Sequence, residues 1–247
     1  MIKRVEKPQK LFTKGPLPVA VVGCGRMGRL HAKVYSQMPH VKLVGVYDIN
    51  PEAAQGVADE VGCSVFEDID SMIGRIAAVT IAAPTNVHPD LAEPFLKNHI
   101  SCLIEKPLAR DVESGQRIVE TAKAANTVVQ VGHIERFNPA FIAMQRLNIQ
   151  PRFIEVTRIS PLTFRGVDVG VVLDMMIHDI DIVLQLAGSK CVKIDAIGVS
   201  VIGDVEDICN ARLTFENGCV ANMTASRLAL KTERRLRVFS RDAYVSL

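Results

Sequence analysis

The chain has 247 residues, of which 48% are hydrophobic and 23% charged, and its formal net charge is +2. A charge this close to zero gives no reason to expect nucleic acid or an acidic membrane as a partner. No run approaches the roughly 18 apolar residues that a membrane span needs, and residues 1–18 lack the apolar core of a secretory signal.

The first half of the chain alternates short apolar runs with helical patterns. We expect strands at 17–22, 41–47, 64–66, 77–82, 101–104 and 128–131, and helices at 26–38, 51–61, 90–98 and 112–126. Strands that alternate with helices form βαβ units, and near-continuous apolar strands are typical of parallel strands buried on both faces. The sequence therefore predicts an α/β fold whose N-terminal domain, residues 1–136, is a doubly wound parallel sheet.

The pattern changes after about Gly132. We expect helices at 139–147 and 174–186, and strands at 152–159, 192–201, 207–215, 219–226 and 233–240. Successive strands without helices between them favour an open, largely antiparallel sheet. Residues 137–247 are therefore expected to form a separate α+β domain.

A glycine motif follows the first expected strand and begins the first expected helix. Gly23, Gly25 and Gly28 fit G-x-G-x-x-G, with Arg26 and Met27 inside it. In this context the glycines allow a tight turn, a close approach of the backbone to a pyrophosphate and close packing of the helix on the sheet. The helix N-terminus then faces the anion. The motif predicts a Rossmann-type dinucleotide site.

Asp48 ends the second expected strand, twenty residues after Gly28. A carboxylate there accepts hydrogen bonds from the adenosine ribose and repels a 2′-phosphate. No Arg or Lys follows closely, so we expect NAD rather than NADP. The alternative interpretation of Asp48 is a helix or turn cap.

Two further stretches carry groups that can move protons. Lys106, in Glu105-Lys106-Pro107, follows a buried strand, where ligands bind in open α/β sheets. It could bind a substrate oxygen, or be a surface lysine in a turn. In the second half, Asp174 and His178 are expected to share a helix face, with Asp181 nearby. Carboxylates would tune the imidazole for acid–base work; an ion pair and a metal site are the alternatives, and we expect no metal.

The six cysteines form no C-x-x-C pair, and most lie in apolar runs. Buried reduced thiols are therefore favoured over disulfides or zinc ligands. With no secretory signal, this favours the cytoplasm.

From about Pro18 onward the chain resembles the Gfo/Idh/MocA family of NAD(P)-dependent oxidoreductases. The shared landmarks are the glycine motif, residues 83–88 (APTNVH), 105–107 (EKP) and 132–139 (GHIERFNP), and Asp174 with His178. The family is usually longer, so we expect the second domain to be minimal or incomplete. The resemblance also implies homo-oligomers, dimers or tetramers, formed through the outer face of the C-terminal sheet.

The resemblance implies roles for individual residues. Lys106 would bind the reacting oxygen, His178 would be the general base, and Asp174 would be its neighbour in the substrate pocket. The nicotinamide-ribose end of the cofactor would be lined by Pro84, Thr85, Asn86, His88, Glu105 and Lys106.

The implied substrate is a sugar or nucleotide sugar. The stretches GHIERFNP and DMMIHDIDIV are similar to a branch that oxidises UDP-N-acetylglucosamine at the 3-position. Substrate contacts would come from Arg136, Asn138, Arg158, Arg165, Asp174 and His178. For the arginines, diphosphate contacts and structural salt bridges both remain open. Alternative hypotheses for the function are a polyol or dihydrodiol dehydrogenase, a tetrapyrrole reductase, and a non-catalytic NAD-dependent sensor.

Overall fold

The structure, a computed structural model, describes residues 15–147, 149–162 and 169–247. The chain divides into two compact units, Met1–Gly132 and His133–Leu247. The boundary expected after residue 136 lies inside the short 3₁₀ turn η3 (Ile134–Phe137), in the second unit. Among the described residues, none of the helices is both long and apolar enough to cross a membrane.

The first unit contains a six-stranded sheet, and all of its neighbouring strands are parallel. The strands are β1 (Leu17–Val22), β2 (Val41–Tyr47), β3 (Ser64–Val65), β4 (Ala78–Ile81), β5 (Ser101–Ile104) and β6 (Val129–Val131). Their spatial order is β3-β2-β1-β4-β5-β6. This is the doubly wound order that was expected, and its switch point lies between β1 and β4, where such sheets bind ligands.

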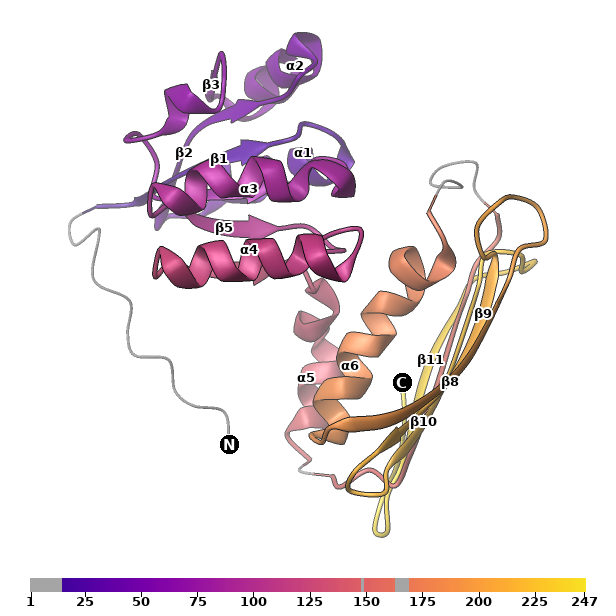
Figure 1. The fold of residues 1–247 in the computed structure, drawn as a ribbon. Helices are drawn as coiled ribbons and strands as arrows, with labels where there is room; N and C mark the ends of the chain where they lie inside the picture. The colour runs from indigo at the N-terminus through magenta and orange to yellow at the C-terminus, as the bar shows by residue number, and fades with distance from the viewer. Residues whose placement is uncertain (1–14, 148, 163–168) are drawn as a thin grey trace. The chain divides into compact units, whose positions relative to one another are not determined.

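Helices cover both faces of this sheet. The longer ones are α1 (Arg26–Gln37), α2 (Pro51–Val61), α3 (His88–Lys97) and α4 (Val112–Ala124), and two 3₁₀ turns are η1 (Asp70–Met72) and η2 (Thr85–Val87). α3 and α4 lie side by side on one face (Figure 1). Two apolar clusters fill the two faces: one contains Phe95 and Ile118 from α3 and α4, the other Ala32 and Val57 from α1 and α2.

Local sequence signals account for the helix ends. The Asn50 side chain accepts hydrogen bonds from the amides of Glu52 and Ala53 at the start of α2, where Pro51 also favours a first helical position. Gly62 ends that helix in the left-handed region, at φ +72°. Asp111 caps α4 by accepting the Ser114 amide at 2.7 Å.

The second unit contains a six-stranded mixed sheet in the order β12-β11-β7-β10-β9-β8. Its strands are β7 (Phe153–Ile159), β8 (Cys191–Val199), β9 (Ile208–Phe215), β10 (Val220–Ser226), β11 (Glu233–Phe239) and β12 (Tyr244–Ser246). β7 and β10 are parallel and every other neighbouring pair is antiparallel. The largely antiparallel sheet was expected, whereas the strand β12 was not.

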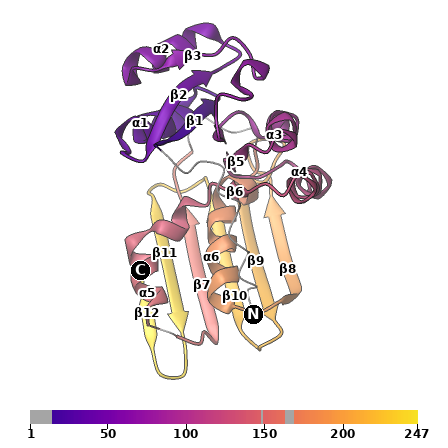
Figure 2. The same ribbon diagram turned by 90° about the vertical axis from the view of Figure 1, so that its left-hand side faces the viewer.

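Two helices, α5 (Pro139–Gln145) and α6 (Ile177–Ala187), cover one face of this sheet (Figure 2). The core between them contains Phe141 of α5, Val183 of α6 and alternating residues of β9 and β10 such as Ala211 and Met223. The helix expected over 174–186 is wrong in its first turn. Residues Val172–Met176 form a π-helix, designated η4, and the α-helix begins at Ile177.

Candidate active site

The glycine motif forms a tight turn between β1 and α1. Gly23 has φ +91°, and a Cβ there would lie 2.7 Å from the backbone of Ala82 and Ala83. A Cβ on Gly28 would lie 1.7 Å from the Gly23 carbonyl oxygen. Both positions therefore exclude any side chain, which ties α1 closely to β1 and to the end of β4.

Gly25 differs from the other two glycines. It is the N-cap of α1, with φ −66° and no side-chain cap, and a Cβ there would meet nothing within 4 Å. Arg26 and Met27, the first residues of α1, are exposed beside it. The helix N-terminus therefore opens onto empty space, and its amides can bind the pyrophosphate of a dinucleotide.

Asp48 follows β2 and is hydrogen-bonded to the same turn. Its Oδ2 accepts the Cys24 amide at 2.6 Å and its Oδ1 accepts the Asn50 amide at 2.9 Å. A carboxylate offers about four acceptor positions, so two remain for ribose hydroxyls. Burial, followed by the charge of Asp48, raises the pKa of the Cys24 thiol to about 12, so this thiol stays neutral inside the turn.

The segment after β4 carries four of the expected cofactor residues. Pro84 and Asn86 are exposed and Thr85 is half-buried, around η2. His88 is different, because it is only 1% exposed. Its Nε2 lies 2.9 Å from the Ala83 oxygen, and its Nδ1 lies 3.2 Å from the Pro107 oxygen. His88 thus joins the segments that follow β4 and β5.

The segment after β5 carries the Glu-Lys-Pro motif. Lys106 is half-buried, and the Lys106–Pro107 peptide bond is cis. Glu105 accepts the Lys106 amide at 3.2 Å, and its other carboxylate oxygen lies 2.8 Å from Nε2 of His31. His31 was not among the expected site residues. Its position three residues after Gly28, on the helix face that packs on the sheet, was the available signal.

In the second unit, Asp174 and His178 do not share an α-helical turn. Asp174 is exposed in the π-helix η4, whereas the half-buried His178 lies in the first turn of α6. The two residues therefore lie in different kinds of helical turn, and their sharing of one helix face stays a prediction. The start of η4 is held from outside: Glu206 Oε1 accepts the Val172 amide at 3.2 Å.

The carboxylates near His178 are paired with arginines. Asp181 accepts two hydrogen bonds from Arg136, one of them from Nε at 2.7 Å. Asp179, 3% exposed, accepts Nε and Nη2 of Arg158 at 2.7–3.0 Å. Burial raises the pKa of Asp179, and the Arg158 guanidinium opposes this rise. Asp181 therefore pairs with Arg136, a contact that the sequence did not predict, and its position beside His178 stays a prediction.

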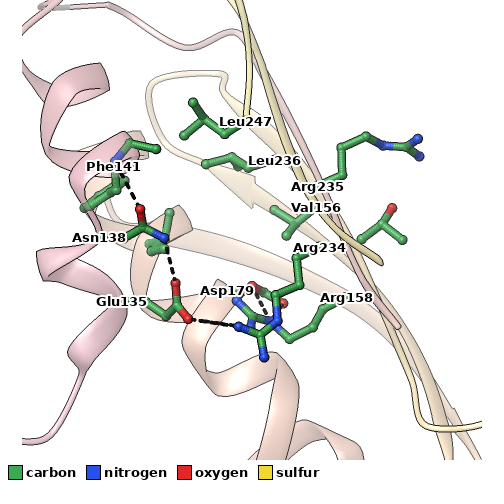
Figure 3. Close-up of a pocket in the computed structure, with 13 residues that line it drawn as sticks. Glu135, Asn138, Phe141, Val156, Arg158, Asp179, Arg234, Arg235, Leu236 and Leu247 are labelled. Carbon is green, nitrogen blue, oxygen red and sulfur yellow. Dashed lines mark hydrogen bonds and ion pairs between the residues drawn. The ribbon is translucent and has the colours of Figure 1, made fainter. Parts of the chain in front are cut away.

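A pocket of about 230 Å³ in the second unit is lined in part by Arg158 and Asp179 (Figure 3). Asn138 lines it, caps α5 through the Ala140 amide at 3.0 Å, and contacts Glu135 at 3.5 Å. Glu135 lies 3.8 Å from Arg158 and 3.7 Å from Arg234. Sequence reasoning missed Glu135 and Asp179 as members of this cluster. Arg165 lies outside the described residues. Among the residues that the structure describes, no group of three or more His, Cys, Asp or Glu side chains could hold a metal ion.

Comparison with known proteins identifies the two units. Residues 17–133 match the oxidoreductase family with an NAD-binding Rossmann fold, GFO_IDH_MocA, and residues 159–246 match the GFO/IDH/MocA C-terminal domain.

Individual relatives agree. A UDP-N-acetylglucosamine 3-dehydrogenase of Acidithiobacillus ferrooxidans is 37% identical over 228 residues, which cover 92% of this chain and 72% of the relative. An inositol 2-dehydrogenase of Rhizobium meliloti is 31% identical over 76% of this chain and 61% of the relative. A solved structure of the A. ferrooxidans enzyme has a TM-score of 0.90 and covers 94% of this chain and 76% of that one. The chain therefore belongs to the Gfo/Idh/MocA family of NAD-binding oxidoreductases.

Proposed function

We propose that this chain is an NAD-dependent dehydrogenase that oxidises the 3-hydroxyl of a UDP-N-acetylglucosamine-like nucleotide sugar. The observation that carries the cofactor assignment is the open first turn of α1, with Asp48 fastened to the glycine turn beside it. The substrate assignment is supported by the 37% identity to the A. ferrooxidans enzyme.

Bound NAD would take up the hydride from the sugar carbon. Lys106 would bind the reacting oxygen, and His178 would accept the hydroxyl proton as general base, with Asp174 as its neighbour. The remaining cofactor contacts would come from the residues around η2, with Glu105 near the nicotinamide ribose. Because both ring nitrogens of His88 face backbone carbonyls, this residue would shape that end of the site rather than bind NAD directly.

The substrate would be bound by Arg136, Asn138, Arg158 and Arg165. A guanidinium has five N–H donors, so an arginine paired with one aspartate can still donate to phosphate oxygens. The Arg136 side chain is 47% exposed and has the room for this, whereas that of Arg158 is 9% exposed. Arg136 is therefore the stronger candidate for a diphosphate contact.

The second candidate substrate is a cyclic polyol. It is favoured by the R. meliloti inositol 2-dehydrogenase and by a 34% identical inositol 2-dehydrogenase of Rubrobacter xylanophilus. The same proton chemistry would serve either substrate, since both reactions oxidise a ring hydroxyl.

The test is NADH absorbance with UDP-sugars, free sugars and inositols in parallel. We expect turnover with UDP-N-acetylglucosamine, and little with inositols. In Lys106→Ala turnover should be lost while NAD binding is largely kept, and Lys123→Ala, an exposed lysine of α4, is the matched control. Wild-type turnover in Lys106→Ala would remove this lysine from the mechanism. NAD binding without turnover on any substrate would favour a sensor.

We also propose that copies of the chain associate through the uncovered face of the second sheet, where Ile197 of β8 is 65% exposed. Light scattering behind a sizing column would test this, with Ile197→Glu expected to weaken association.

The six free thiols suit a reducing compartment such as the cytoplasm.

A further inference from the structure

A polar contact inside the first unit links α1 to the Glu-Lys-Pro segment. Nε2 of His31 lies 2.8 Å from Oε1 of Glu105, and the two side chains are 20% and 12% exposed. One turn later on α1, Tyr35 reaches β4, with its hydroxyl 2.6 Å from Oγ1 of Thr80. The face of α1 that packs on the sheet therefore carries polar groups that fasten it to the strands on the ligand-binding edge.

The Glu105 carboxylate is confined on three sides. His31 contacts one oxygen, and the Lys106 amide donates to the other at 3.2 Å. A Cβ on Gly132 would lie 3.1–3.2 Å from the carboxylate atoms, so the lack of a side chain there gives the group its room. The Glu105 side chain is thus hydrogen-bonded to the main chain at Lys106.

The charge of this carboxylate depends on the same contacts. Burial pushes the pKa of Glu105 upward, but the hydrogen bond and charge of His31, with smaller effects of Lys106, bring it below its usual value. Among the residues that the structure describes, the titratable groups that act on Glu105 are His31, from α1, and Lys106, from its own segment. Without His31, burial would dominate and favour the protonated acid.

We propose that His31 is a positioning residue for the nicotinamide end of the cofactor site, because it orients the Glu105 carboxylate and keeps it anionic. This rests on the proposed function, in which Glu105 lies near the nicotinamide ribose. An anion there attracts the cationic ring of NAD⁺ more than the neutral ring of NADH. His31 also connects the helix that would bind the pyrophosphate with the segment that carries Lys106.

The first test needs no cofactor. The Glu105 carboxyl is titrated by carbon-detected NMR in wild type, His31→Ala and His31→Gln. We expect a raised Glu105 pKa in His31→Ala and a smaller rise in His31→Gln, because glutamine restores a neutral donor. His40→Ala, an exposed histidine of the same unit, should behave as wild type. An unchanged Glu105 titration in His31→Ala would overturn the proposal.

The second test is calorimetry with NAD⁺ and NADH separately, from about pH 5.5 to 8, on proteins whose thermal unfolding shows that they are folded. In the wild type, the Glu105 carboxylate stays charged over this pH range, so its titration should change the NAD⁺ affinity little. In His31→Ala it should fall severalfold toward low pH, more than for NADH, and the added substitution Glu105→Gln should remove this trend. Equal losses for both coenzymes at every pH would indicate a purely structural role and overturn the proposal. If the wild type binds neither coenzyme, the proposed function fails, whereas the NMR titration still decides whether His31 governs Glu105.

Discussion

Asp48 accepts the backbone amide of Cys24 through Oδ2 at 2.6 Å, so the acid that follows β2 is fastened to the glycine turn that follows β1. The residue that would select the ribose is thus hydrogen-bonded to the turn that would bind the pyrophosphate. A substitution at 48 can therefore act on coenzyme choice, on the shape of the turn, or on both.

Two substitutions separate these effects. Asp48→Asn keeps an acceptor oxygen but removes the charge, so we expect little loss of stability and a narrowed preference for NAD over NADP. Asp48→Ala also removes the bond to Cys24 and the acceptor for the ribose hydroxyls, and losing a ribose hydrogen bond to a charged group, worth about 1.5–3 kcal/mol, predicts at least a tenfold weaker NAD affinity. Coenzyme titrations check both, with Asp59→Asn on the exposed face of α2 as control. A wild-type preference for NADP would contradict the role of Asp48.

The glycine motif offers a separation of binding from folding. Gly25→Ala adds a methyl group into open space at a φ that alanine adopts, so we expect only the loss of about 1 kcal/mol that alanine causes at an N-cap. NAD affinity should fall at least tenfold, because the methyl group occupies the path of the pyrophosphate. Calorimetry and thermal unfolding measure the two quantities.

Gly28→Ala should mainly lower the stability of the fold, since its Cβ would collide with the Gly23 carbonyl oxygen. Overpacking of this kind costs about 1–3 kcal/mol, and we expect a lowered melting temperature. Gly56→Ala, in α2 with nothing within 4 Å, is the control and should be neutral or slightly stabilising. The pyrophosphate assignment would be wrong if Gly25→Ala bound NAD as tightly as Gly56→Ala.

The two arginine–aspartate pairs of the second unit differ in burial, and their stabilities should differ accordingly. Arg158→Ala leaves Asp179 buried without its guanidinium, which predicts a loss of about 3–5 kcal/mol. Arg136→Ala removes a more exposed arginine and leaves the buried Asp181 with the hydrogen bond from Gln185, so it should cost less, about 1–3 kcal/mol. Urea unfolding compares them. Equal losses would show that burial does not set the strength of these pairs.

The same variants test the substrate assignment. Arg136→Ala should raise the KM for a UDP-sugar more than that for a free sugar, because only the former carries a diphosphate. An equal effect on both substrates would assign Arg136 to structure alone.

Local signals explain why the strands and the dinucleotide turn were predictable. The parallel strands are short apolar runs, and the glycine motif with Asp48 needs only the order strand, turn, helix, strand. The π-helix η4 was not predictable, because the Glu206 carboxylate that holds its first residues comes from 34 positions later. The partners of Asp179 and Asp181 were equally hidden, since they lie 21 and 45 residues away in sequence. Spacing within one helix could not reveal contacts made by tertiary folding.

Asp207 gives a prediction for acid stability. Its Oδ2 accepts the amides of Val201 and Ile202 at 2.7 Å, and its Oδ1 accepts Nε of Arg227 at 2.6 Å. These hydrogen bonds lower the pKa of Asp207 to about 2, with the backbone amides contributing most.

A carboxyl whose pKa is depressed on folding binds fewer protons in the folded state than in the unfolded state. Its stabilising effect is therefore complete above the unfolded pKa of about 4 and is lost as the pH falls toward 2. Asp207→Asn should lower stability at neutral pH and flatten the dependence between pH 4 and 2, as measured by urea unfolding at several pH values. Asp195→Asn, an exposed aspartate on β8, should leave that dependence unchanged. If Asp207→Asn lost stability between pH 4 and 2 as steeply as wild type, other carboxylates would govern the acid response of this unit.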